Sequence, residues 1–349
     1  MIETLRTYGH QLAGPVFDEP QQLVSYMGAV QGQDLEMCKW AVGMRLKQSS
    51  VNSVREAIDS GRIIRTHILR PTWHLVSAED IRWILNTCGN RLRTAYMTSW
   101  GKHWGVDEEK YAQFRDATEK VITGTEGLTI QELTASLEDA GYPWSQDQVK
   151  TMLAVGEAEG LICNGREKGR KHTYALLDER VPTAAGISKE ESMSRLALKY
   201  FQSHSPASLE DFVWWSGMSG AEAKAAVGSI AGELVTDRYE GQKLYVHQSR
   251  IKESIPDGDV HLLPPYDEYL ISYRDRTHVL EPKHSSKAHN NFGIFHPVIL
   301  YKGRIVGNWK KVTKKGGIEI ETTFFNTAGA PGKRKMQQAI DRYLDFLKE

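Results

Sequence analysis

One supersecondary pattern recurs three times between residues 20 and 246 of the chain. Each copy reads as three helical runs, a glycine near the end of the third run, and two β-like runs joined by a polar turn. This order is that of a winged helix, in which the third helix commonly enters a DNA major groove and the hairpin contacts the backbone. Because an internal repeat of this kind dominates a fold, the sequence predicts an α+β protein built on three tandem winged helices.

The first copy carries recognisable start and stop signals. Asp34, Ser49 and Ser50 are residue types that cap helix N-termini, and Gly61 is the type that ends a helix. These signals place the first winged helix near the N-terminus of the chain. Its predicted helices are residues 20–28, 34–47 and 51–60, and its wing strands are residues 62–66 and 71–76.

The second and third copies follow the same order. The predicted helices are residues 114–122, 130–138 and 145–159 in the second copy and residues 191–203, 208–215 and 219–231 in the third. The wing strands are residues 161–164 and 172–177 in the second copy and residues 234–236 and 243–246 in the third. Two further helices, residues 78–86 and 90–100, are expected to bridge the first two copies.

After Ile251, the repeated pattern of helices and hairpins gives way to short β-like runs. Short β-like runs with turns at Lys302-Gly303 and Gly316-Gly317 predict a small β-barrel or curved sheet, closed by a helix over residues 332–348. The runs are residues 260–267, 269–271, 293–295, 298–301, 304–309 and 318–323. Since 349 residues exceed the usual size of a single core, we expect several domains. The predicted boundaries are 1–105, 106–182, 183–252 and 253–349.

The charge balance restricts how the chain would bind nucleic acid. Lysines and arginines total 44, the same number as aspartates and glutamates, so DNA contacts must come from local clusters rather than from a global positive field. Basic clusters do fall on the wing-like hairpins, although exposed turns are charged in most proteins. The candidate DNA-binding residues in these clusters are Arg62, Arg65, Arg70, Arg166, Lys168, Arg170, Lys171, Lys310 and Lys311.

Other site classes find little support in the sequence. Cys38, Cys88 and Cys163 are far apart in apolar contexts, which is typical of buried thiols in a reducing compartment. The spacing of the histidines at 278, 284, 289 and 296 matches no metal-ligand pattern, so no cofactor is expected. The chain shows no secretion signal and no apolar run long enough to span a bilayer. These features predict a soluble cytoplasmic protein.

Gln31 and Gln33 lie between two apolar helical runs. The simpler interpretation is a solvated helix junction. The chemical alternative is that two neutral amides position a water molecule and hydrogen-bond to a developing charge. An extended segment would direct both side chains to the same side, whereas a continuous helix would not.

Five segments resemble, in order and spacing, the winged-helix DNA glycosylases of the AlkZ-like and YcaQ-like type. They are MGAVQGQD at residues 27–34, ILRPTWHLV at 68–76, LLPPYD at 262–267, YRDR at 273–276 and GRIVGNWK at 303–310. The resemblance implies three winged helices, a β-barrel and a monofunctional glycosylase that removes N7-alkylated purines, in some members from interstrand crosslinks. Its catalytic signature, Gln-x-Gln or Gln-x-Asp, falls on Gln31 and Gln33. The middle position, often aliphatic in the family, is Gly32 here.

The implied chemistry needs no nucleophilic lysine and no metal. N7 alkylation makes the base a cationic leaving group, so the C1′–N9 bond breaks with oxocarbenium character while Gln31 and Gln33 orient water and stabilise the cation. Arg70 and His74 would contact phosphate near the lesion, and the hairpin between Phe292 and Ile305 would enter the duplex. The implied partner is double-stranded DNA with alkylated bases, bound by a monomer that is nucleoid-associated in that state.

Two other functions remain open at this level. The same scaffold could serve as a non-catalytic winged-helix DNA-binding or transcription-regulatory protein, or it could bind other proteins. The zero net charge is compatible with both, because a processive DNA protein is often more basic. Base release from alkylated DNA separates the enzyme from these two.

Overall fold

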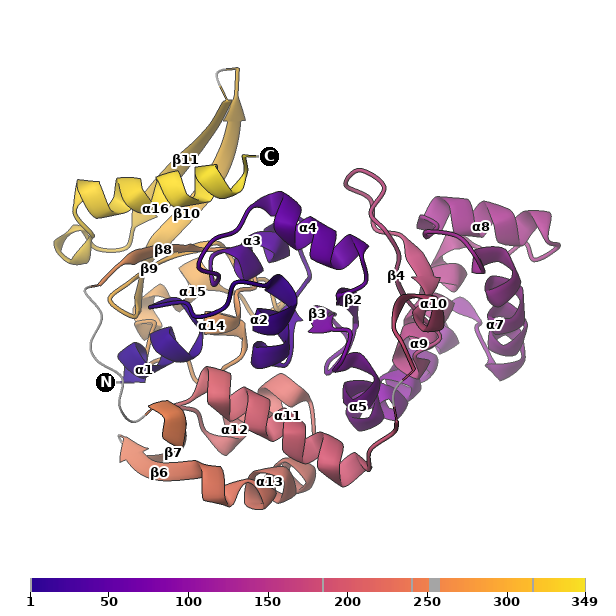
Figure 1. The fold of residues 1–349 in the computed structure, drawn as a ribbon, viewed down its shortest axis with the longest axis horizontal. Coiled ribbons are helices and arrows are strands. Elements are labelled where there is room, and N and C mark those ends of the chain that lie inside the picture. Colours follow the sequence, from indigo (N-terminus) through magenta and orange to yellow (C-terminus); the bar gives the residue numbers. More distant parts are fainter. Residues whose placement is uncertain (1, 184, 240, 251–257, 316, 349) are drawn as a thin grey trace. The chain divides into compact units, whose positions relative to one another are not determined.

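The computed structural model describes residues 2–183, 185–239, 241–250, 258–315 and 317–348 (Figure 1). These residues form two compact units, one made of residues 1–55 with 194–349 and the other of residues 56–193. The predicted four-domain division is finer and stays a prediction. Three predicted features lie outside the described residues. They are the boundary at residues 252–253, the change of sequence pattern at Ile251 and the turn residue Gly316.

The first unit begins with one helix that was not predicted, followed by the helices expected for the first winged helix. They are α1 (Ile2–Gly9), α2 (Pro20–Met27), α3 (Met37–Gly43) and the start of α4 (Val51–Asp59), with the short strand β1 (Val30–Gln31) between α2 and α3. Helix α1 was not predicted, and each of the other three lies inside the range that the sequence predicts. Asp34 caps the second helix as expected, since its Oδ1 accepts the N–H groups of Glu36 and Met37 at 3.0 and 2.9 Å.

The third predicted winged helix also belongs to the first unit. Its helices are α11 (Lys189–His204), whose first five residues are counted with the second unit, α12 (Leu209–Ser216) and α13 (Gly220–Ser229). The hairpin pairs β6 (Leu234–Tyr239) with β7 (Gln242–His247), and short 3-10 turns flank it at Ala231–Glu233 and Gln248–Arg250. Ser208 and Ser219 start α12 and α13 with capping boxes, which confirms the predicted start sites.

The C-terminal strands form an open sheet in the described part of the chain, and the predicted closed barrel is not found there. The antiparallel order is β11 (Gly317–Phe324), β10 (Arg304–Lys314), β9 (Val298–Tyr301), β8 (Val260–Leu263). Four strands are too few to close around a filled interior. Helix α16 (Lys333–Phe346) packs against this sheet instead, with the ring of Tyr343 5.1 Å from that of Trp309.

Two predicted strands of this region are not strands. Residues 269–271 belong to the short helix α14 (Glu268–Ile271), because the side chain of Asp267 accepts the N–H of Tyr269 at 2.9 Å and starts a helical turn. Residues 293–295 lie in a turn closed by an isolated bridge between His289 and Phe295, after α15 (Ser285–Ala288) and a 3-10 turn at Pro282–His284. Apolar runs this short do not distinguish a helix from a strand by period.

The second unit contains the remaining helices and two hairpins. Its helices are α7 (Glu108–Ile122), α8 (Ile130–Asp139), α9 (Gln146–Glu159) and α10 (Leu177–Arg180), and its hairpins pair β2 (Ile63–His67) with β3 (Trp73–Ser77) and β4 (Ile162–Asn164) with β5 (Tyr174–Leu176). Thr129 and Ser145 start α8 and α9 with capping boxes, and Gly160 ends α9 at φ +75°. The helices and strands predicted for the second copy are thus present, and their assignment to a winged helix stays a prediction.

The two predicted bridging helices are one. Helix α5 (Ile81–Tyr96) runs through the expected break at Gly89 and continues as a π-helical turn (Met97–Gly101) and α6 (Lys102–Trp104). A Cβ atom at Gly89 would lie 2.5 Å from the carbonyl oxygen of Ala158 in α9. Gly89 therefore permits the close approach of α5 to α9, and it does not mark a turn.

Buried histidines make the stability of the fold depend on pH. Burial lowers the pKa of His10 and of His261 well below the usual 6.5, and Arg342, whose guanidinium lies 2.9 Å from His261 Nδ1, lowers the pKa of His261 further. As the pH falls through 6.5, the unfolded chain therefore binds protons that the folded chain does not. The free energy of unfolding should therefore have its full value above about pH 7 and should decrease as the pH falls below that.

Denaturant unfolding between about pH 7.5 and about pH 5 measures this decline, above the range where carboxylates titrate. The His261→Asn variant keeps an acceptor for Arg342 but cannot take up the proton, so its stability should fall less steeply with acidification. A free energy of unfolding that is constant across this range would contradict the prediction.

Candidate active site

The glutamine segment sits between a helix end and a helix cap. Helix α2 ends at Gly28, whose φ of +78° turns the chain and whose missing side chain leaves room for Trp215, since a Cβ there would be 3.3 Å from the indole. Ala29 and Val30 follow and are buried. Val30 and Gln31 form the short strand β1, so the chain is extended up to Gln31, whereas Gln33 lies beyond this strand in a bend.

Gln31 is fixed from both sides. Its side chain is 4% exposed, its backbone N–H donates to Glu268 Oε1 at 2.6 Å, and its Oε1 accepts the N–H of Gly32 at 3.0 Å. Among the described residues, Gln31 Nε2 makes no hydrogen bond. The amide oxygen thus keeps a second lone pair, and Nε2 keeps its two N–H donors, for interaction with a ligand.

Gln33 differs from Gln31 in its surroundings. It lies in an exposed bend before the cap residue Asp34. The structure thus brings the two glutamines close together along the chain, one buried and ordered by hydrogen bonds, the other exposed. This asymmetry was not foreseen from the sequence, which suggested two equivalent amides.

Glu268 lies beneath the glutamine segment as a buried carboxylate, 1% exposed. Besides the Gln31 N–H, it accepts the indole N–H of Trp215 on Oε2 at 3.2 Å and the hydroxyl of Ser272 on the same oxygen. His204 Nε2 is 3.5 Å from Oε2. Burial lowers the pKa of His204, and the neighbouring Glu268 carboxylate opposes that shift.

The residue before Glu268 forms a second buried anchor. Arg45 and Asp267 make a bidentate ion pair, with nitrogen–oxygen distances of 2.7 and 2.9 Å and side chains 0% and 1% exposed. The indole N–H groups of Trp40 and Trp309 donate to the carbonyls of Leu262 and Leu263, both at 2.7 Å. Residues 262–268 are therefore held firmly against α3 and the sheet.

Sequence reasoning missed Glu268 and the Arg45–Asp267 pair. Asp267 lies at the end of one of the segments that carried the family resemblance, but it received no role there, and Glu268 lies just beyond that segment. Two adjacent acids after Pro264-Pro265-Tyr266 are a visible signal, since acids in that context are candidates for helix caps. Nothing in the sequence pairs them with residues more than 200 positions away.

Several of the predicted DNA-binding residues of the first wing are not on the surface. Arg65 is 5% exposed, stacks on Trp73 at 4.1 Å and contacts His172 at 3.1 Å. His74 is 0% exposed, and its Nδ1 is 2.9 Å from the carbonyl of Thr72. Arg62 and Arg70 are half-buried, and Arg62 lies 3.7 Å from Glu56.

The other basic clusters lie on the exposed β4–β5 and β10–β11 hairpins, where half of their cations are already paired with carboxylates. Arg166, Lys168, Lys310 and Lys314 form ion pairs with Glu126, Glu132, Glu321 and Glu319. Within the described residues, no ion pair involves the exposed Arg170, Lys171, Lys311 or Lys315. These four side chains are the ones best placed to exchange water for phosphate.

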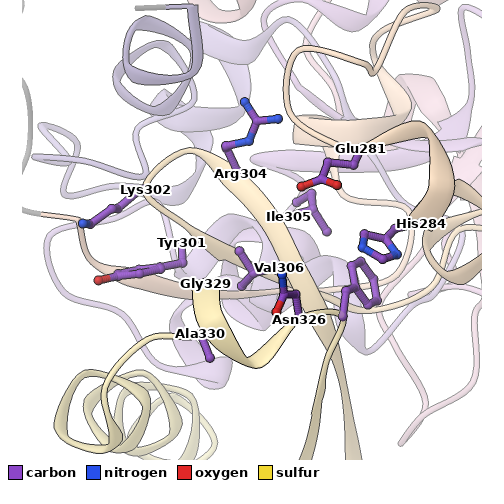
Figure 2. A pocket seen from close by; sticks show the side chains of 11 residues that line it. Glu281, His284, Tyr301, Lys302, Arg304, Ile305, Val306, Asn326, Gly329 and Ala330 are labelled. Atoms are coloured by element: carbon purple, nitrogen blue, oxygen red, sulfur yellow. The ribbon is translucent and has the colours of Figure 1, made fainter.

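A separate pocket of about 430 Å³ opens beside the β9–β10 turn (Figure 2). Arg304 and Glu281 line it, but each is paired elsewhere, Arg304 with Glu3 at 3.1 Å and Glu281 with Lys283 at 2.7 Å. His284 stacks on Phe325 at 4.8 Å. Neither glutamine lines this pocket, and we assign it no part in the chemistry.

Three further observations bear on the sequence predictions. Cys38, Cys88 and Cys163 are free and buried as expected, and burial raises the pKa of the Cys88 thiol to about 11. No cluster of three or more His, Cys, Asp or Glu side chains in the described ranges is arranged to hold a metal ion. Within those ranges, no helix has the length and hydropathy needed to cross a bilayer.

Comparison with known proteins gives consistent matches over the chain. The family model described as DNA glycosylase AlkZ-like matches residues 24–346. The interstrand DNA cross-link repair glycosylase of Streptomyces sahachiroi is 23% identical over 331 residues, which cover 91% of this chain and 88% of that protein. The solved structure of the DNA glycosylase AlkZ from Streptomyces sahachiroi superposes with a TM-score of 0.82 at 20% identity, covering 99% and 95% of the two chains.

The Arg45–Asp267 pair predicts a large stability effect. The Asp267→Asn variant leaves a buried guanidinium without its counter-charge, which should cost about 3–5 kcal/mol in the free energy of unfolding. The matched control is Asp18→Asn, which removes an exposed pair with Lys47 at 2.9 Å and should cost about 0–1 kcal/mol. Denaturant unfolding measures both, and equal effects of the two variants would contradict the prediction.

Proposed function

The chain belongs to the AlkZ-like DNA glycosylase family, and from this we propose that it hydrolyses the N-glycosidic bond of N7-alkylated purines in double-stranded DNA. The observation that carries the proposal is Gln31, held at the end of an extended segment with Gln33 exposed beside it. We assign to these two residues the catalytic role of the Gln-x-Gln signature that the family resemblance implies. We assign the chain to DNA repair in the cytoplasm.

The chemistry of the substrate suits two neutral amides. An N7-alkylated purine carries a positive charge, so it departs from C1′ as a neutral base and leaves the charge on the sugar. Amide oxygens stabilise that oxocarbenium ion and orient a water whose oxygen bonds to C1′ while a proton is lost to solvent. No protein nucleophile and no metal ion takes part in this scheme.

The roles of the two glutamines follow from their surroundings. Gln31 is already ordered by Glu268 and by the N–H of Gly32, so it would position the water at little entropic cost. Gln33 is exposed and would become ordered against the DNA. The middle residue, Gly32, contributes its backbone N–H to this arrangement rather than a side chain.

Crosslinked purines fit the same chemistry. The relative from Streptomyces sahachiroi is named an interstrand DNA cross-link repair glycosylase. A crosslink between two N7 atoms leaves each purine with the same cationic leaving group as a simple N7-alkylated base. We therefore include interstrand crosslinks among the proposed substrates.

We propose that each unit binds the DNA backbone through exposed cations of its own, in the β4–β5 turn of the second unit and on the β10–β11 hairpin of the first. Arg170, Lys171, Lys311 and Lys315 carry this role, with Arg62 and Arg70 at the edge of the first wing. Arg65 and His74 are buried, so we give them a structural role in the wing. The exposed Phe292, at 92%, lies in the turn closed by His289 and Phe295, at the start of the segment that was expected to enter the duplex.

A second candidate is a DNA-binding protein on the same scaffold without catalysis. The burial of Gln31 favours it, since a 4% exposed side chain offers little surface to a substrate. The two candidates differ in base release and agree in DNA binding.

The catalytic proposal is tested with duplex DNA that contains N7-methylguanine. The Gln31→Ala and Gln33→Ala variants should each lower the single-turnover rate of base release by about 10²–10³-fold, because each loses one group aimed at the transition state. Heating or alkali treatment reveals the abasic sites, and a chelator should leave the wild-type rate unchanged.

The outcomes separate the candidates. Wild-type protein that binds the duplex but releases no base would leave only the DNA-binding protein. Full activity in both glutamine variants would leave a glycosylase with a different catalytic centre.

The DNA-binding surface is tested by the salt dependence of affinity. The Arg170→Ala, Lys171→Ala double variant should lower the slope of log affinity against log salt concentration by about 0.9 for each phosphate that the protein no longer neutralises. Lys168→Ala, in the same turn but paired with Glu132 at 2.8 Å, should change it less. An unchanged slope in the double variant would remove this turn from the DNA-binding surface.

A further inference from the structure

We propose that Glu268 is a positioning residue of the active site and that it acts by holding the backbone of Gln31. This inference rests on the proposed catalytic role of Gln31. It adds a third, charged residue to a site that has so far been described by two neutral amides. Glu268 does not touch the substrate in this scheme.

The contact between the two residues is short and buried. The Gln31 N–H donates to Glu268 Oε1 at 2.6 Å, and both side chains are at most 4% exposed. A hydrogen bond to an ionised acceptor is shorter and stronger than one between neutral groups. It fixes the backbone at the residue whose side chain would orient the water.

The second oxygen of Glu268 explains why the first one stays in place. Oε2 accepts from Trp215 of α12 and from Ser272, which follows α14, and lies 3.5 Å from His204 of α11. These neighbours belong to three different helical segments, so the carboxylate cannot rotate without breaking several interactions. Oε1 is thus directed at Gln31 by the packing of the whole unit.

The geometry makes distance the critical variable at this contact. Positions in a catalytic site matter at the level of about 1 Å, where misplacement costs on the order of 10²-fold in rate. The Glu268→Asp variant keeps the charge but withdraws the oxygen by one methylene. The Glu268→Gln variant loses the charge but keeps an acceptor oxygen at the original length.

We expect Glu268→Gln to be more active than Glu268→Asp, which is the opposite of the order that the loss of charge alone would give. In single-turnover base release, Glu268→Gln should lose up to about 10-fold and Glu268→Asp about 10²-fold, with the affinity for DNA nearly unchanged in both. The Gln31 amide proton, followed by NMR in the full chain, should move upfield in both variants as its hydrogen bond weakens or lengthens.

The matched control is Asp211→Asn. Asp211 is another buried carboxylate of the same unit, 1% exposed, and it accepts the N–H groups of Ser208, Arg274 and Asp275. None of these three donors belongs to a glutamine of the site. The variant should be less stable and should keep the rate per folded molecule at the wild-type value.

Three outcomes would overturn the inference. One is a wild-type rate in Glu268→Asp, another is a Glu268→Asp variant more active than Glu268→Gln, and the third is an equal rate loss in Asp211→Asn. Each leaves the proposed function intact if Gln31→Ala, assayed in parallel, is inactive. If Gln31→Ala is fully active, the proposed catalytic centre fails, and the amide proton shifts still report whether Glu268 holds Gln31.

Discussion

The adjacent carboxylates Asp267 and Glu268 are the constraint on which the first unit depends. Taking two negative charges out of water is costly unless each is paired or fully hydrogen-bonded. Asp267 meets that requirement with Arg45, and Glu268 meets it with an amide, an indole and a hydroxyl. The donors come from both halves of the first unit, so the two acids cannot be satisfied until those halves have assembled. The same requirement brings Gln31 to its place.

This arrangement requires contacts between residues that are far apart in the sequence. Gln31 and Glu268 are 237 positions apart, and the whole second unit, residues 56–193, is inserted between the two halves of the first. Loop-closure entropy grows only slowly with loop length, so the insertion is tolerated at equilibrium. The insertion should instead slow folding, because contacts between residues far apart in the sequence form late. The halves of the first unit must therefore find each other across a unit that has its own core.

Local signals in the sequence are sufficient for most elements but not for long-range contacts. Four helices start where predicted, because a capping box involves only the N-cap residue and the third residue after it. Their N-caps are Thr129, Ser145, Ser208 and Ser219. In the sequence, Gly89 indicates the end of a helix. Its actual role, leaving room for the carbonyl of Ala158, becomes visible only in the structure. The barrel prediction rests on short strands, whose pairing order is not a local property. For the site, the sequence indicates Gln31 and Gln33 through resemblance, while the burial of Arg65, His74 and Glu268 depends on residues distant in the chain.

The fixed position of Gln31 also bears on which acids the motif tolerates. The signature that the resemblance implies, Gln-x-Gln or Gln-x-Asp, would vary only at its second position. In this structure the first position adjoins the carboxylate of Glu268, and an aspartate there would set two negative charges side by side in a buried site. The second position is exposed, where a charge is hydrated at no cost. In this structure a negative charge would therefore cost more at position 31, beside Glu268, than at position 33.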